Sequence, residues 1–309
     1  MVTFDDTFFI GVSYALNSLI GFFFTGFVLA VILLSELRAN RTFRIIALLC
    51  VSDLVQLFCL AIASVIVMVG DIPLEKRPFI DKFVGALILG SWMAMVFLEL
   101  ALAINRLAVI TDTTFLLKVE MICLPISFFV GVYFTICLLI FDTHSHMDFQ
   151  ILTFKSYRST RLSRLNFSMQ LWFSVVPMIL NIVAYAIIGI YIFAKKLQTR
   201  WNEIRFLVAV IGGFVYTLFL ACFYHYWYDI FNDNRTIWII QHHAWTFLFT
   251  FACCLHLHFN SELRKNAVGL LKKAKKIISR SNSVQTIYVQ KFESALSREA
   301  AARNSVYPF

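Results

Sequence analysis

The stretch Leu98-Glu-Leu-Ala-Leu-Ala-Ile-Asn-Arg-Leu107 decides to which class of protein this chain belongs. It lies in a long apolar run and carries two formal charges, Glu99 and Arg106, seven residues apart. On a helix these two side chains share a face about 10 Å apart. Because a charge inside a membrane helix is costly, it needs a structural or functional reason. The stretch therefore predicts a membrane helix with an interior acid and a terminal arginine.

The composition of the whole chain is that of a membrane protein. Of its 309 residues, 60% are hydrophobic and only 15% are charged, and the mean hydropathy is +0.77. Soluble globular proteins are about 45–50% apolar and about 25% charged. No internal repeat is evident, so a transporter built from two related halves gains no support. All seven cysteines lie in apolar runs, which excludes a disulfide between loops.

Seven runs are apolar and long enough to span a bilayer, which takes roughly 20 residues each. They predict an all-α, rhodopsin-like bundle of seven transmembrane helices, at about residues 11–34, 45–69, 83–105, 121–141, 165–193, 206–228 and 237–259. The first run follows Asp5 and Asp6 rather than basic residues, so we interpret it as a span that is not cleaved.

The basic residues of the short loops set the expected orientation. With the N-terminus outside, the inner loops and the C-terminal tail together receive 19 of the 27 arginines and lysines, among them Arg38, Arg41, Arg44 and Lys118. This predicts a multi-pass plasma-membrane protein with a cytoplasmic C-terminus, whose basic excess faces the lipid bilayer and not nucleic acid. The sequon at Asn234 would then be an outer glycosylation candidate, whereas the sequon at Asn40 would face the cytoplasm.

The C-terminal part of the chain has a different pattern. Residues 1–260 form the expected transmembrane domain. In residues 261–279 apolar side chains recur at helical spacing between lysines and arginines, which predicts a cytoplasmic amphipathic helix on the inner leaflet. Residues 280–309 are polar and are expected to be a disordered cytoplasmic tail.

Two acids, Asp53 and Glu99, fall within predicted spans, so both should face the bundle interior. Each either packs there, bonded to neighbours such as Ser52 or Asn105, or forms an ion or proton site that biases helix positions. Arg106 either neutralises a helix end and reaches the membrane surface, or takes part in signalling.

Aromatic, methionine and histidine side chains crowd the outer halves of several spans. A cavity with an apolar lining and few polar groups is where a small ligand would bind. The pocket candidates are Trp92, Met95, Met169, Trp172, Phe223, Tyr224, Trp227 and His242.

An enzyme would have to be built on the histidines, and their spacing does not favour one. No H-x-x-x-H or H-E-x-x-H pattern occurs, and G-x-S-x-G, G-x-x-x-x-G-K and C-x-x-C are absent. We therefore expect no enzyme, no metal and no cofactor. A zinc hydrolase would contradict this by containing metal when purified.

Several motifs together resemble those of G-protein-coupled receptors. Leu49-Cys-Val-Ser-Asp53 is similar to the L-x-x-x-D of the second span, and Asn105-Arg106 stands where the Asp/Glu-Arg-Tyr motif would be. Pro177 and Tyr185 have the spacing of the fifth span. More narrowly, the chain resembles nematode serpentine chemoreceptors, closest to class T. The stretches that carry this resemblance begin at Asn40, Ser52, Phe83, Ser91, Leu100 and Asn260.

The resemblance implies a receptor in sensory cilia that detects a small environmental molecule and signals through a heterotrimeric G protein. It assigns coupling and activation to Arg106, Asn105, Tyr185 and Pro177. The residue before Arg106 is not an acid, so we expect no adjacent carboxylate to hold that arginine, and Glu99 is the acid to test instead. The alternative is a transporter or ion-conducting protein that uses Asp53 and Glu99.

Overall fold

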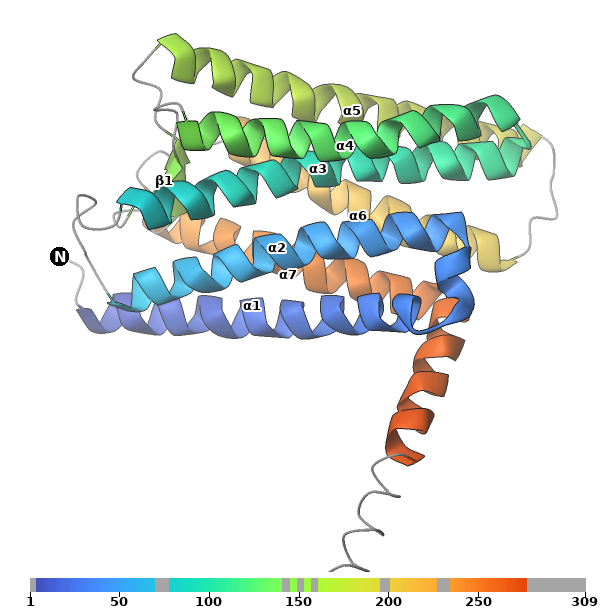
Figure 1. The fold of residues 1–309 in the computed structure, drawn as a ribbon, viewed down its shortest axis with the longest axis horizontal. Helices are drawn as coiled ribbons and strands as arrows, with labels where there is room; N and C mark the ends of the chain where they lie inside the picture. The colour runs from blue at the N-terminus through green and yellow to red at the C-terminus, as the bar shows by residue number, and fades with distance from the viewer. Residues whose placement is uncertain are drawn as a thin grey trace, which may run out of the picture. The chain divides into compact units, whose positions relative to one another are not determined.

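The computed structural model describes residues 4–69, 78–140, 145–148, 153–156, 161–194, 201–226 and 234–276. Most of these residues form long helices (Figure 1). The elements in chain order are α1 Phe4–Leu33, the 3₁₀ helix η1 Glu36–Ala39, α2 Arg41–Val69, α3 Pro78–Thr111, α4 Thr114–Ile140, β1 Ser145–Asp148, β2 Thr153–Ser156, α5 Arg161–Ala194, α6 Trp201–Tyr226 and α7 Arg235–Phe259.

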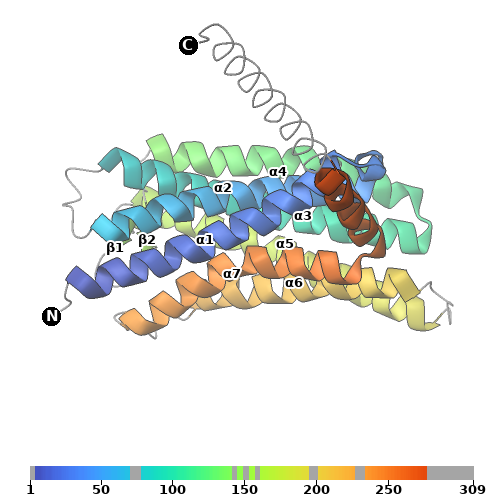
Figure 2. The same ribbon diagram turned by 90° about the horizontal axis from the view of Figure 1, so that it is seen from below.

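Six of the long helices form a closed ring, and α3 has the most neighbours among them. In the order of their contacts, α1 packs on α2, α2 on α3, α3 on α5, α5 on α6, α6 on α7 and α7 on α1. Helix α4 packs on the outer side of α3, and this is the most extensive contact in the bundle (Figures 1 and 2). Successive long helices run in opposite directions. The end of α3 at Arg106 therefore meets the starts of α2 and α4, and we call this the Arg106 end.

The helices agree with the predicted spans in number and position but are longer than most of them. Hydropathy marks only the apolar part of a helix, whereas backbone hydrogen bonding continues into polar flanks such as Arg161–Arg164. Among the described helices six are apolar and long enough to cross a membrane. The helix that does not meet this criterion is α7, which corresponds to the predicted span at 237–259. Its Gln241 and four histidines lower its mean hydropathy.

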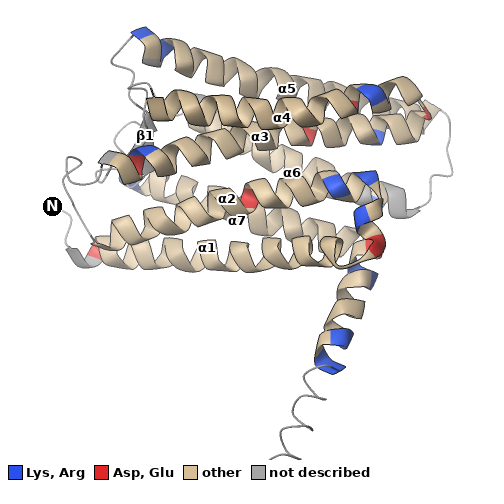
Figure 3. Ribbon diagram, in the orientation of Figure 1, with Lys and Arg blue, Asp and Glu red and all other residues tan. Residues whose placement is uncertain are grey.

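The charges of the described residues gather at the ends of the helices (Figure 3). Among the described residues, the acids of α2 and α3 are the charged groups in the middle of the bundle. At the end opposite Arg106, β1 and β2 form an antiparallel hairpin in which Ser145 pairs with Ser156 and Asp148 with Thr153. The hairpin contacts α3 and α7. The sequence pattern predicts no strand in this loop.

Two glycines bring α3 and α4 together. A Cβ added at Gly131 would lie 2.9 Å from the carbonyl oxygen of Gly90, and one added at Gly90 would overlap Thr135. Small residues allow the backbones of membrane helices to approach closely. The main core cluster lies beside this contact and includes Trp92, Met93 and Phe134.

A further helix covers residues 261–276, most of the amphipathic segment predicted for 261–279. Its start is capped by Asn260, whose Oδ1 accepts hydrogen bonds from the backbone N–H groups of Glu262 and Leu263. The chain divides into two compact units, residues 1–263 and 264–309. The tail predicted for 280–309 lies outside the described residues.

Candidate functional site

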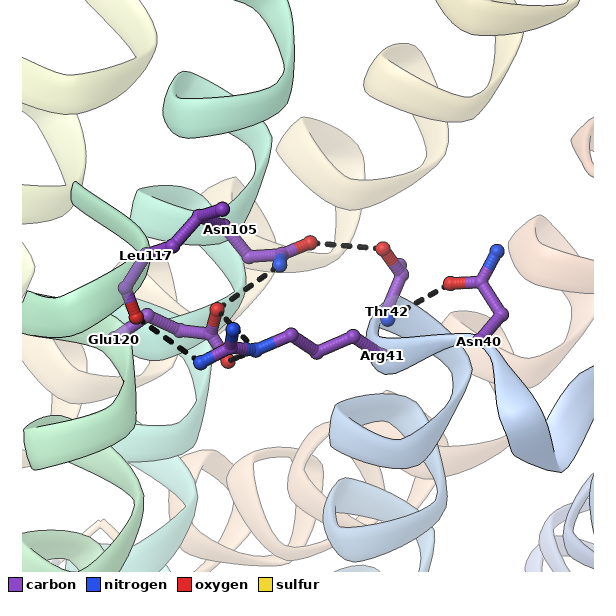
Figure 4. Close-up of polar contacts among 6 residues, drawn as sticks. All are labelled: Asn40, Arg41, Thr42, Asn105, Leu117 and Glu120. Carbon is purple, nitrogen blue, oxygen red and sulfur yellow. Dashed lines mark hydrogen bonds and ion pairs between the residues drawn. The ribbon is translucent and has the colours of Figure 1, made fainter. Parts of the chain in front are cut away.

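At the Arg106 end, Asn105 is buried and takes part in a polar network between helices (Figure 4). The hydroxyl of Thr42, from α2, donates a hydrogen bond to Asn105 Oδ1 over 2.8 Å. Asn105 Nδ2 in turn donates to Glu120 Oε2 of α4 over 3.0 Å. Asn105 therefore joins α2 to α4 through a single side chain of α3.

Glu120 is the only acid of this network, and it is fully buried. Arg41 at the start of α2 places its Nε 2.8 Å from both carboxylate oxygens. The Nη2 of Arg41 donates to the carbonyl oxygen of Leu117 over 3.0 Å. The arginine side chain is 30% exposed, so one side of the ion pair reaches the surface of the bundle.

Local sequence explains why α2 begins where it can supply this arginine. Asn40 precedes the helix, and its Oδ1 accepts the backbone N–H of Thr42 over 3.0 Å, as is typical of a helix N-cap. Its carbonyl oxygen accepts the first bond of the helix, from the N–H of Arg44. All three residues of the Asn40 sequon thus have structural roles.

Arg106 lies one position beyond the network, next to a small apolar cluster at this end of the bundle. The cluster contains Ala103 and Leu107 of α3, Ala184 and Ile188 of α5, with Leu207 of α6 packed against it. Tyr185 also packs on this cluster, and its ring centroid lies 5.9 Å from that of Phe214. Pro177 lies about two turns before Tyr185, within α5.

The two intramembrane acids line one cavity between α2, α3, α5, α6 and α7, with a volume of about 60 Å³. Tyr185 and His256 line it as well. Thr217 donates a hydrogen bond to Glu99 Oε1 over 3.0 Å. Asp53 Oδ1 and Glu99 Oε2 are buried and have no hydrogen-bond partner among the described residues.

The neighbours that the sequence suggested for these acids bond elsewhere. Ser52 donates to the carbonyl oxygen of Ser91, and Asn105 bonds to Glu120. Thr217, which lies 118 residues from Glu99, was not anticipated. The interpretation of the acids as packing groups bonded to Ser52 or Asn105 is therefore wrong in its partners.

The pocket candidates divide into interior and surface residues. Trp92 and Met95 are buried in the main core cluster, and Met169 packs against it. The Trp92 ring centroid lies 4.5 Å from that of Trp245, which also contacts Tyr224 and donates to Gln56 Oε1. Of the candidates only Met95 lines the cavity described above.

The remaining candidates lie at the edges of this interior. Phe223 contacts Trp238 with ring centroids 6.5 Å apart. Trp172 is 64% exposed and faces outward from α5. Trp227 lies outside the described residues.

The histidine pair of α7 packs against α1. His242 is buried and stacks on Tyr14 with ring centroids 3.8 Å apart. His243 Nε2 lies 3.2 Å from the Ser13 hydroxyl, and its backbone carbonyl accepts a hydrogen bond from Asn17. In the part of the chain that the structure describes, no three His, Cys, Asp or Glu side chains gather in a group that could hold a metal ion.

The glycosylation candidate Asn234 is exposed and caps α7. Its Oδ1 accepts the backbone N–H of Ile237 over 3.3 Å. Asn166, in the other sequon of the predicted outer side, is buried within α5.

Sequence reasoning did not single out Glu120. The expectation that no adjacent carboxylate holds Arg106 stays a prediction, and the structure places the carboxylate of Glu120 on the neighbouring Asn105. The available signal was position: Glu120 is an acid placed directly before an apolar run and among basic loops.

Comparisons with known proteins address the whole chain. A family model described as "Serpentine type 7TM GPCR chemoreceptor Srt" matches residues 5–281. Among solved structures, the chain is similar to the crystal structure of squid rhodopsin, with a TM-score of 0.65 and 12% sequence identity. That match covers 89% of this chain and 87% of the rhodopsin chain. No curated protein sequence matches the chain significantly.

Proposed function

Because the chain belongs to the Srt family of serpentine seven-transmembrane chemoreceptors, which are receptors and not enzymes, we propose that it detects a small environmental molecule. The signal would pass to a heterotrimeric G protein. The observation that carries this proposal is the family match over residues 5–281, supported by a bundle that shares the rhodopsin fold. In such a multi-pass membrane protein, we further propose that the Arg106 end faces the cytoplasm, and that the protein resides in a sensory cilium.

The proposed ligand site is the half of the bundle opposite Arg106. Met95 and Trp245 contact Gln56 there, Trp92 packs on Trp245, and Met169 packs against the same core cluster, which provides an apolar, aromatic surrounding with a polar group. Such surroundings suit small organic ligands. Trp172, being largely exposed to the outside of α5, is not part of this proposal.

The cavity between Asp53 and Glu99 would have a different role. Its volume of about 60 Å³ is far below the 300–1,000 Å³ of typical ligand sites but is large enough for a few water molecules. We propose that water or a small cation between the two carboxylates couples the ligand half to the Arg106 end. Tyr185 and His256, which line the same cavity, extend it in that direction.

The experiment is a screen of volatile and small metabolites on cells that express the full chain, with calcium and cAMP readouts. For each active compound, Arg106→Ala is expected to abolish the response while surface expression remains. Arg38→Ala, which removes an exposed arginine of η1, is the control and should respond normally. A full response from Arg106→Ala would contradict the coupling role.

The same screen separates the receptor from a transporter. Ligand-evoked current or uptake that persists without G protein would favour the ion-conducting alternative, for which the two acids in one cavity are the supporting observation.

A further inference from the structure

The contacts of Glu120 account for an ionised group that is otherwise costly to bury. A carboxylate removed from water is tolerated when it is paired and its oxygens are hydrogen-bonded. Glu120 meets both conditions, with Arg41 Nε at 2.8 Å and Asn105 Nδ2 at 3.0 Å. The remaining acceptor of the network, Asn105 Oδ1, is used by Thr42. We call Arg41, Thr42, Asn105 and Glu120 the three-helix network.

The three-helix network fixes the rotation of the last turns of α3. Asn105 lies between Ala103 and Leu107, the two α3 residues of the apolar cluster at the Arg106 end. Because its side chain is bonded to α2 on one side and to α4 on the other, α3 cannot turn about its axis without breaking these bonds.

The apolar cluster at the Arg106 end packs α3 against its neighbours. It joins α3 to α5 and α6 through Leu107, Ile188 and Leu207. A partner that enters between these helices must first separate the side chains of this cluster.

We infer that Glu120, with Arg41 as its counter-ion, is a positioning residue that acts through Asn105 to hold the receptor in a closed conformation, in which α3 stays packed on α5 and α6. The acid thus comes from α4 and not from the residue beside Arg106. The inference rests on the proposed coupling to a G protein. A conformation that loses favourable interactions becomes less populated relative to its alternatives, so weakening the network should favour the open state.

The first test measures basal signalling, because no ligand is required. The full chain is placed in nanodiscs with purified heterotrimeric G proteins of each class, and binding of labelled GTPγS is followed. Glu120→Gln and Arg41→Gln should each raise basal exchange about tenfold, the effect of losing roughly one charge-assisted hydrogen bond. The control is Arg44→Gln, which removes the same charge from an exposed position one turn along α2 and should leave exchange unchanged.

The second test exchanges the acid and the amide. Asn105→Asp alone places a second carboxylate against Glu120 and should raise basal exchange further by repulsion. In the double variant Asn105→Asp with Glu120→Gln, the new carboxylate accepts from Thr42 and from the new amide at position 120, whose oxygen accepts from Arg41. The bonds of position 105 to Thr42 and to position 120 are kept with the charge moved to α3, and Arg41 loses only its contact with the second oxygen of position 120. Exchange should therefore fall below that of either single variant.

The outcomes separate the inference from the proposed function. Restored exchange in the double variant supports the positioning role, since a packing defect at either site would add to the other. Equal exchange in the parent and Glu120→Gln, or a double variant more active than both single variants, overturns the inference. Absence of exchange by the parent and by every variant with every G protein, compared with empty nanodiscs, would instead contradict the proposed function.

Discussion

The two carboxylates inside the bundle are held in different ways. One oxygen of Glu99 accepts a hydrogen bond from the Thr217 hydroxyl, whereas Oδ1 of Asp53 has no hydrogen-bond partner among the described residues. A buried oxygen without a partner costs free energy unless water or a cation reaches it. The cavity beside Asp53 has room for either.

Replacing Asp53 by Asn tests whether this carboxylate transmits the signal. The change keeps the shape of the side chain and removes its ability to carry charge. If Asp53 couples the two halves of the bundle, the potency of an agonist found by the screen should change by about fivefold or more. Dose–response curves in cells with equal surface expression measure this. Unchanged potency and unchanged basal activity would leave Asp53 with a packing role.

The bond between Thr217 and Glu99 has a measurable effect on stability. Thr217→Val keeps the shape and removes the hydroxyl, and should lower the free energy of unfolding by about 0.5–1.5 kcal/mol. Thermal unfolding of the purified protein measures the change. Thr246→Val is the matched control, since its buried hydroxyl bonds only to the carbonyl oxygen of His242 in its own helix. Equal losses in the two variants would show that the bond to Glu99 adds nothing.

Among the elements, α3 and α4 depend on the absence of side chains at their contact. Gly90→Ala would place a methyl group on Thr135 and close to the carbonyl oxygen of Gly131, so the helices must separate. We expect a loss of about 1–3 kcal/mol in the free energy of unfolding, as for other overpacked sites.

The control for this change is Gly26→Ala in α1. An added Cβ there meets no atom within 4 Å, and alanine is favoured over glycine inside helices. Thermal unfolding should show Gly26→Ala at least as stable as the parent. A Gly90→Ala protein of parental stability would mean that α3 and α4 are not constrained by this contact.

The elements also show where sequence reasoning ends. The seven helices could be predicted because apolar runs and their flanks are local features of the sequence. The run that contains Asp53, for example, could be recognised without knowing what packs against it. The partners of these helices could not, because Arg41 meets Glu120 across 79 residues and Thr217 meets Glu99 across 118. Such pairs depend on the order of helices in the ring and on their rotation, for which a single sequence carries no periodic signal.

For the molecule as a whole, the orientation in the membrane remains a prediction that glycosylation can test. With the N-terminus outside, Asn234 should carry a glycan, and Asn234→Gln should remove a mobility shift of a few kilodaltons that glycosidase treatment also removes. Asn40→Gln should leave the mobility unchanged, because Asn40 would face the cytoplasm. A glycan on Asn40 would reverse the orientation.

The polar composition of α7 bears on how the protein is assembled during synthesis. On leaving the translocation channel alone, a helix with this many histidines and Gln241 would enter hydrocarbon poorly. It is received by polar groups of helices already inserted: Ser13 and Asn17 of α1 contact His243, and Tyr216 of α6 bonds to the carbonyl oxygen of Ala244. The first helix, α1, thus completes its contacts only after α7, the last helix of the bundle, has been inserted. A chain that ends before residue 234 should therefore be retained and degraded instead of reaching the cell surface.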